Sequence, residues 1–300
     1  MLIETIREGF LAQWVLGATM ELNDFYADAL RKLREAGLED VARKIAVKAQ
    51  DSIRIRRDES SSGVPVPSKL GGKPNLPPTF AWPVSKSHPL AFVAQFNLSE
   101  VAPLAQDSDL PADGALYVFY DWKEQPWGFE VQDSEGWSIV YLPPEDLHTL
   151  EELDPPTDQP EDCPFFKETF IRFHRQRTLP GPDSPVADDL DEDDLDAYCD
   201  IIGDLEEEHR PLHQFFGYPN QDQSTDMPEE AAELAPQAFP EPPPAPSQPG
   251  DEEWLMLLQI DTDDEAGFMW GDMGRLHFWI RRDDLRFRRF ERVWMFLLCA

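Results

Sequence analysis

The chain has little cysteine and little positive charge. Its three cysteines in 300 residues include no CxxC pair, which argues against a disulfide framework or a zinc site of that type. We therefore expect a reducing, cytoplasmic location. Lys and Arg number 26 against 59 Asp and Glu, so the formal net charge is −33. Such a deficit of cations argues against a nucleic-acid-binding surface and against docking on anionic lipid.

Long apolar runs are also missing near the N-terminus. The apolar stretch at residues 9–20 is shorter than the roughly 20 residues that a bilayer span needs. Charged residues precede it and no small-residue cleavage site follows, so it is better read as an amphipathic helix than as a signal peptide. We expect no targeting segment and no membrane partner.

The pattern of apolar residues predicts two strand-rich segments behind a helical one. Apolar side chains three and four residues apart over residues 22–49 indicate an N-terminal helical hairpin, to which we assign residues 1–57. Short apolar runs separated by Pro, Gly and Asp predict a first β-rich half at residues 58–143 and a second at residues 251–300.

The chain between these halves is acidic. We assign residues 144–223 to an acidic, partly helical insertion, in which apolar residues at helical spacing over residues 188–209 predict an amphipathic helix. Residues 183–208 contain thirteen acids and no Lys or Arg. Residues 224–250 are rich in proline and carry no positive charge, so we expect a flexible loop there.

Two short blocks occur twice in the same order. Residues 92–97 (FVAQFN) align with 256–261 (MLLQID), and residues 114–119 (GALYVF) align with 274–279 (GRLHFW). The offsets of the two blocks, 259 − 95 = 164 and 274 − 114 = 160, differ by only four residues. This agreement predicts an internal duplication, and hence an α+β fold with a β-rich core of two duplicated, pseudo-symmetric halves.

Polar and aromatic residues of these and neighbouring blocks are the candidate ligand or partner residues. Gln95 and Gln259 stand mid-strand in the two copies, where a buried amide must find partners, such as loop backbone across the pseudo-axis. Alternatively, Asp261, Asp272 and Gln259 could face Asn97 and Gln95 across a cleft between the halves and perform general acid–base chemistry. Tryptophans beside Pro- and Gly-rich turns are either core anchors or the lining of a ligand site. The full set is Trp82, Gln95, Asn97, Gln259, Asp261, Trp270 and Asp272.

Two patterns approach the spacing of metal ligands. Asp261, Asp263 and Asp272 fit positions 1, 3 and 12 of a calcium loop, but glycine falls at position 7 instead of 6 and Asp replaces the bidentate Glu. His209 and His213 are four residues apart, with a proline between them that interrupts the helix. A solvated turn and a turn anchor are the simpler interpretations, so we expect no metal and no cofactor. No Ser or Cys lies in a recognisable nucleophile elbow, and we assign no catalytic residue.

Several blocks together resemble one known family. They are SKLGGKP at residues 68–74, LP at 76–77, WP at 82–83, QFNL at 95–98, LP at 110–111, GAL at 114–116, HQ at 213–214, GYP at 217–219, LLQID at 257–261, and residues 269–279. As a set they are similar to the YwqG-like family of bacterial proteins, a domain of unknown function, over about residues 60–300. The resemblance implies an α+β, β-rich fold with a duplicated core, and it implies no established activity.

The charge layout favours a binding protein over an enzyme. The electric field of a protein with a net charge of −33 can steer a basic partner, which predicts an acidic protein-binding module. A concrete version is an immunity-like or antitoxin-like protein that masks a cationic toxin. Two alternatives stay open: acidity that only keeps the protein soluble, and a small-ligand-binding or hydrolase-like protein with a carboxylate-lined cleft between the halves. The sequence leaves the oligomeric state open.

Overall fold

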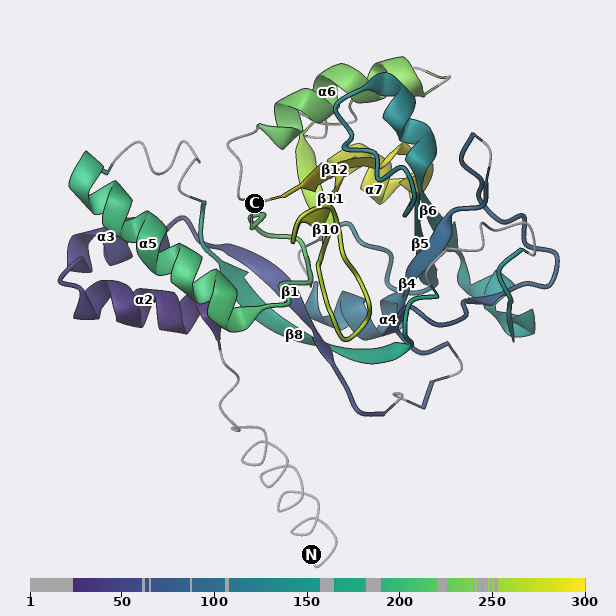
Figure 1. Ribbon diagram of the computed structural model, residues 1–300, viewed down its shortest axis with the longest axis horizontal. Coiled ribbons are helices and arrows are strands. Elements are labelled where there is room, and N and C mark those ends of the chain that lie inside the picture. The colour runs from purple at the N-terminus through teal and green to yellow at the C-terminus, as the bar shows by residue number, and fades with distance from the viewer. Residues whose placement is uncertain are drawn as a thin grey trace, which may run out of the picture.

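The computed structural model shows an α+β protein built on one large antiparallel sheet (Figure 1). It describes residues 24–299 except 61–62, 65, 87, 106–107, 157–164, 182–189, 221–225, 240, 242–245, 247, 249 and 251–252. The start of the expected helical hairpin, residues 1–23, therefore lies outside the described residues. No helix within the described ranges has the length and apolar character needed to cross a bilayer.

Six α-helices and twelve strands lie in the described ranges. The helices are α2 (Phe25–Glu35), α3 (Glu39–Ala46), α4 (Leu98–Val101), α5 (Glu192–His209), α6 (Met227–Ala238) and α7 (Arg282–Arg286). The strands of the large sheet are β1 (Gln50–Arg57), β2 (Lys69–Leu70), β4 (Ala91–Asn97), β5 (Ala115–Tyr120), β6 (Trp137–Leu142), β8 (Thr169–Thr178), β9 (Gln214–Phe215), β10 (Trp254–Asp261), β11 (Arg275–Arg281) and β12 (Trp294–Leu298). A separate pair joins β3 (Asn75–Leu76) to β7 (Glu151–Glu152).

The strand arrangement of the large sheet is nearly symmetric about its central pair. Its strand order is β12-β11-β10-β9-β1-β8-β2-β4-β5-β6, so β1 and β8 are the central pair. On one side a two-residue strand, β9, links β1 to the meander β10-β11-β12, and on the other a two-residue strand, β2, links β8 to the meander β4-β5-β6. The apolar runs predicted as strands form β4, β5, β6, β10, β11 and β12.

The two ends of the sheet meet, so the sheet is nearly closed. The rings of Trp137 on β6 and Trp294 on β12 pack edge to face with centroids 5.2 Å apart. Trp137 Nε1 donates to the backbone oxygen of Val293 at 3.0 Å. The interior between the half-sheets holds one apolar cluster that includes Phe96, Phe215 and Trp270.

A helical layer covers one end of the central ribbon, at the left of Figure 1. Asp191 caps α5 through a hydrogen bond from the Asp194 amide. On the inner face of α5, Tyr198 and Leu205 are fully buried and join one apolar cluster with residues of α2 and α3. The acidic amphipathic helix predicted for this segment is therefore present.

Two segments differ from the sequence-based expectation. Residues Gln50–Arg57, assigned to the helical hairpin, form β1, because alternation of isoleucine with polar residues has the two-residue period of a strand. Met227–Ala238, assigned to the flexible loop, forms α6, because Asp226 caps it and Met227, Ala231 and Ala235 bury one face at four-residue spacing.

Candidate functional site

Each half of the sheet holds a loop through a buried glutamine. Gln95 on β4 accepts from the Asn75 amide at 2.8 Å and donates to Pro67 O at 2.8 Å and to Asn75 Oδ1 at 2.9 Å. Gln259 on β10 accepts from the Asn220 amide at 2.9 Å and donates to Leu212 O at 2.6 Å and to Asn220 Oδ1 at 3.1 Å. Both side chains are fully buried, and each binds the loop of its own half rather than backbone across the sheet.

The loops held by these glutamines also match. Residues 68–75 (SKLGGKPN) and 213–220 (HQFFGYPN) each begin with a short strand and turn through two residues of positive φ. These residues are Gly71 and Gly72 in one loop and Phe216 and Gly217 in the other. Each loop ends on an asparagine whose backbone oxygen is bound by the strand that follows the glutamine strand. In the first half Tyr117 Oη of β5 donates to Asn75 O at 2.6 Å, and in the second His277 Nε2 of β11 lies 3.0 Å from Asn220 O.

Charge distinguishes the second half from the first. Opposite Lys69 of β2 lies the apolar Phe170, whereas opposite Gln214 of β9 lies Arg54. At the ends of the glutamine strands, Asn97 faces Ala115 in the first half, and Asp261 faces Arg275 in the second. At the positions of Arg54, Asp261 and Arg275 the second half therefore has buried ionic groups where the first half has neutral side chains. Lys69 is the reverse case, a buried cation of the first half that pairs with Glu168. The three ionic groups of the second half identify the candidate site.

The ionic groups form a cluster beneath α5. Arg275, which is 1% exposed, places Nε 3.2 Å from Asp261 Oδ1 and Nη2 3.3 Å from Glu206 Oε2. Asn220 Nδ2 donates to the other oxygen of Glu206 at 2.8 Å. The second oxygen of Asp261 accepts from the Leu212 amide at 2.8 Å. The two carboxylates and Arg275 are thus engaged with one another and with the loop.

Arg54 is the least compensated member of this cluster. Its side chain is 3% exposed, and its Nε donates to Gln176 Oε1 at 3.3 Å. In the described part of the chain, its Nη1 has no hydrogen-bond partner. Burial, aided by the positive charges of Arg56 and Arg275 and opposed by Asp261 and Glu206, lowers the pKa of Arg54 to about 9.

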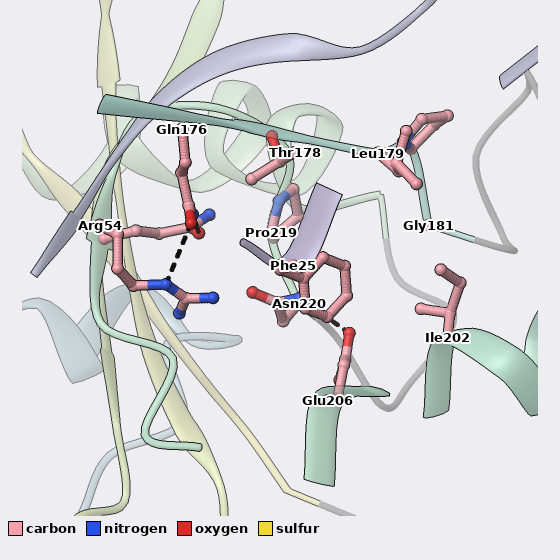
Figure 2. Close-up of a pocket in the computed structure, with 12 residues that line it drawn as sticks. Phe25, Arg54, Gln176, Thr178, Leu179, Gly181, Ile202, Glu206, Pro219 and Asn220 are labelled. Carbon is pink, nitrogen blue, oxygen red and sulfur yellow. Dashed lines mark hydrogen bonds between the residues drawn. The ribbon is translucent and has the colours of Figure 1, made fainter. Parts of the chain in front are cut away.

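A small cavity lies beside this guanidinium (Figure 2). It offers about 20 Å³ to the centres of water-sized molecules, so it holds a small molecule and not a nucleotide or a sugar. Arg54 and Gln176 lie at one end of the view, and Leu179 and Ile202 lie at the other. The cavity therefore has a cationic end and an apolar end.

A neighbouring pair, His213 and Asp263, holds the loop in register. His213 Nδ1 accepts from the Asp261 amide at 3.0 Å, so Nε2 carries the proton that it shares with Asp263 Oδ2 at 3.2 Å. Arg57 also binds Asp263. Burial alone would raise the pKa of Asp263, but the hydrogen bonds from His213 and Arg57 outweigh it and hold that pKa well below its usual range.

The predicted candidate residues do not share one site. Strands β9, β1, β8 and β2 lie between the strands of Gln259 and Gln95 in the order of the sheet. Asn97 donates to Val66 O at 2.9 Å and caps α4, and Trp82 is half-buried with its Nε1 bound to Leu90 O. Trp270 is buried against Phe268, and Asp272 is exposed. Only Gln259 and Asp261 belong to the ionic cluster and its loop.

Of the alternative metal ligands, His213 and Asp263 pair with each other. Asp261 and Asp263 are engaged with Arg275 and Arg57, and Nε2 of His209 lies 3.2 Å from Asp28. In the described ranges, no three His, Cys, Asp or Glu side chains gather in a way that could hold a metal ion.

Sequence reasoning missed the residues that make the cavity. Arg54, Glu206 and Asn220 come from a strand, a helix and a loop that are distant in sequence. One signal was available, because the match between SKLGGKPN and HQFFGYPN would have aligned the two loops and directed attention to the residues that differ around them.

Comparison with known proteins gives a family and no activity. A family model described as a domain of unknown function, DUF1963, matches residues 68–299. No curated protein matches the chain. The narrower similarity to the YwqG-like family remains a prediction.

Proposed function

The chain belongs to the DUF1963 family, a domain of unknown function, and we propose that it is an acidic cytoplasmic protein-binding module whose partner presents a basic surface. We also propose that the two half-sheets arose by duplication, which the matching hydrogen bonds of Gln95 and Gln259 support. In this proposal the sheet is the scaffold and the acidic helix α5 is the recognition element.

The observation that carries this proposal is a row of acids along α5. Acidic residues recur every four positions on its solvent-facing side, at Glu192, Asp196, Asp200, Asp204 and Glu208. Like charges at this spacing repel one another and weaken a helix. Lys32 pairs with Glu208 at 2.7 Å, but no ion pair is found at Asp196, Asp200 or Asp204 within the described residues.

The row has the dimensions of a protein-recognition surface. From Glu192 to Glu208 the helix rises by sixteen steps of about 1.5 Å, or about 24 Å. The opposite face of α5 is fixed by Tyr198 and Leu205 in the apolar cluster, so the charges are held on a rigid element. A partner with Lys or Arg at a matching spacing would be attracted at long range and would relieve the repulsion on contact. A cationic toxin masked by an immunity-like protein is the concrete version.

A second candidate function is the binding of a small ligand. The cavity beside Arg54 favours it, because a buried guanidinium with an open Nη1 provides a site for an acceptor group. The hydrolase-like alternative has less support, because Gln95, Gln259 and Asp261 are engaged in holding loops.

The test compares two charge-matched triple variants. D196N/D200N/D204N removes three charges from the row, and D113N/E124Q/E291Q removes three charges from exposed positions elsewhere. Proteins retained by the wild type from a lysate of the source cells are identified, and the strongest basic protein is purified and titrated at two salt concentrations. We expect the row variant to weaken its affinity about tenfold and to reduce its salt dependence, while the dispersed variant stays within about twofold. Equal loss in both variants, or an affinity insensitive to salt, would contradict the proposal.

A further inference from the structure

We propose that the cavity beside Arg54 binds a small aliphatic carboxylic acid, with its carboxylate on the guanidinium and its short chain toward Ile202. The inference is independent of the protein-binding role of the α5 row, because the ligand would lie in the interior rather than on that surface.

The first argument is the state of the guanidinium. Arg54 is 3% exposed, and its Nε donates to Gln176, yet Nη1 is buried without a partner in the described ranges. A buried charge that lacks an acceptor costs far more than one that is paired and hydrogen-bonded. The fork of Nη1 and Nη2 has the planar geometry that a carboxylate meets with two oxygens.

The second argument is that the neighbouring polar groups already have partners. Gln176 bonds to Arg54 and, more weakly, to Gln214 at 3.4 Å. Asn220 binds Gln259 and Glu206. Glu206 in turn lies 3.3 Å from Arg275. We therefore assign the acceptor for Nη1 to a molecule in the cavity.

The third argument is the division of the lining into polar and apolar parts. Figure 2 places Arg54 and Gln176 at one end and Leu179 and Ile202 at the other, with Phe25 between them. Phe25, Leu179 and Ile202 are 4%, 7% and 7% exposed, so an aliphatic chain against them would be removed from water. A ligand that satisfies both ends is a carboxylate with an apolar tail.

The size and charge of the site select among anions. The volume of about 20 Å³ open to water-sized centres is close to that of one water and excludes all but the smallest carboxylates. Glu206 lines the same cavity, so a doubly charged phosphate would meet a carboxylate across a small space. A single negative charge matches the single guanidinium whose Nη1 is open.

The test is calorimetric titration of the full chain with sodium formate, acetate, propionate, butyrate and valerate at constant ionic strength. We expect dissociation constants of about millimolar, as a ligand of only a few heavy atoms allows, with formate, acetate and propionate binding more tightly than butyrate and valerate. Arg54→Met removes the guanidinium at similar volume and should weaken propionate binding at least tenfold. Arg56→Met removes the same charge two residues along β1, outside the cavity lining, and should change it less than twofold.

A second pair of variants covers the case in which Arg54→Met does not fold. Arg54→Lys keeps the charge and loses the fork, so propionate should bind at least threefold more weakly. Ile202→Ala enlarges the apolar end of the cavity, so the carboxylate that binds most tightly should have a chain longer by one or two carbons. Binding of water only, seen as no heat at 50 mM propionate, would overturn the proposal. Equal responses to chloride, phosphate and propionate, or equal losses in the Arg54 and Arg56 variants, would also overturn it.

Discussion

Arg56 of β1 lies directly opposite Arg172 of β8, at the point where the two half-sheets meet. Burial lowers the pKa of Arg56, and the charge of Arg172 lowers it further. Like charges directly opposite each other on an antiparallel pair destabilise it. The centre of this very acidic protein therefore carries a local excess of positive charge.

Reversing one of these charges should stabilise the protein. In Arg172→Glu the exposed partner becomes an anion facing Arg56, and we expect the free energy of unfolding to rise by about 0.5 kcal/mol. Urea unfolding at low salt measures this change. Arg175→Glu is the matched control on the same strand, because Arg175 pairs with Asp51 at 3.1 Å and its reversal should give no gain. A loss of stability in Arg172→Glu would show that the two arginines do not repel each other appreciably.

The two buried glutamines should contribute equally to the free energy of unfolding. Gln95→Leu and Gln259→Leu each leave the amide of an asparagine and a backbone oxygen without their partner. Each change should lower the free energy of unfolding by about 2–3 kcal/mol, the cost of unsatisfied buried groups. Gln237→Leu on the exposed side of α6 should stay within about 0.5 kcal/mol. Urea unfolding of the three variants makes the comparison, and costs that differ widely between the two halves would contradict their equivalence.

The parts of the fold that depend on local pattern were predictable. Residues 91–97 and 254–261 are apolar runs bounded by turn residues, and both are strands. Strand β1 was missed because its alternation of Ile and Arg directly follows the helical pattern of residues 22–49. The position at which a helical period of 3.6 residues gives way to a strand period of two is hard to place from sequence. Helix α6 was missed because prolines nearby suggested a loop, whereas Pro228 stands in the first turn, where proline is tolerated.

The site was not predictable from local pattern. A single arginine in a strand normally points to solvent, whereas Arg54 is buried beside a cavity that residues of α2, β8, α5 and β9 also line. Its burial depends on the pairing of residues 53–54 with 214–215, which lie about 160 positions away. The carboxylates of Asp261 and Asp272 were predicted to converge, but the turn after β10 leaves one buried and the other exposed.

Stability at acid pH should depend on Asp263. The pKa of this carboxyl is lowered in the folded protein, so it stabilises the fold above its unfolded pKa of about 3.9 and loses this effect as the pH falls through the folded value. Asp263→Asn should cost about 3 kcal/mol at pH 7, because Arg57 and His213 lose a buried partner. The difference from wild type should shrink as the pH falls below about 4. Urea unfolding from pH 7 to pH 3 checks this, and a difference that stays constant would show that Asp263 is not ionised in the fold.

The closure of the sheet should depend on a glycine. Gly128 lies between the sheet ends, where its amide binds Asp133 and its oxygen accepts from Trp294 Nε1 at 2.9 Å. Its φ is +85°, and an added Cβ would meet the backbone oxygen of Met295 on β12. Gly128→Ala should therefore lower the free energy of unfolding by about 3 kcal/mol through backbone strain and overpacking.

Gly203→Ala on α5 is the control for Gly128→Ala. A Cβ at Gly203 meets nothing within 4 Å, so this change should raise the free energy of unfolding by about 0.5–1 kcal/mol through helix propensity. Thermal unfolding of the two variants, with tryptophan fluorescence reporting on Trp137 and Trp294, distinguishes them. A Gly128 variant as stable as the wild type would mean that the sheet ends do not need this close approach.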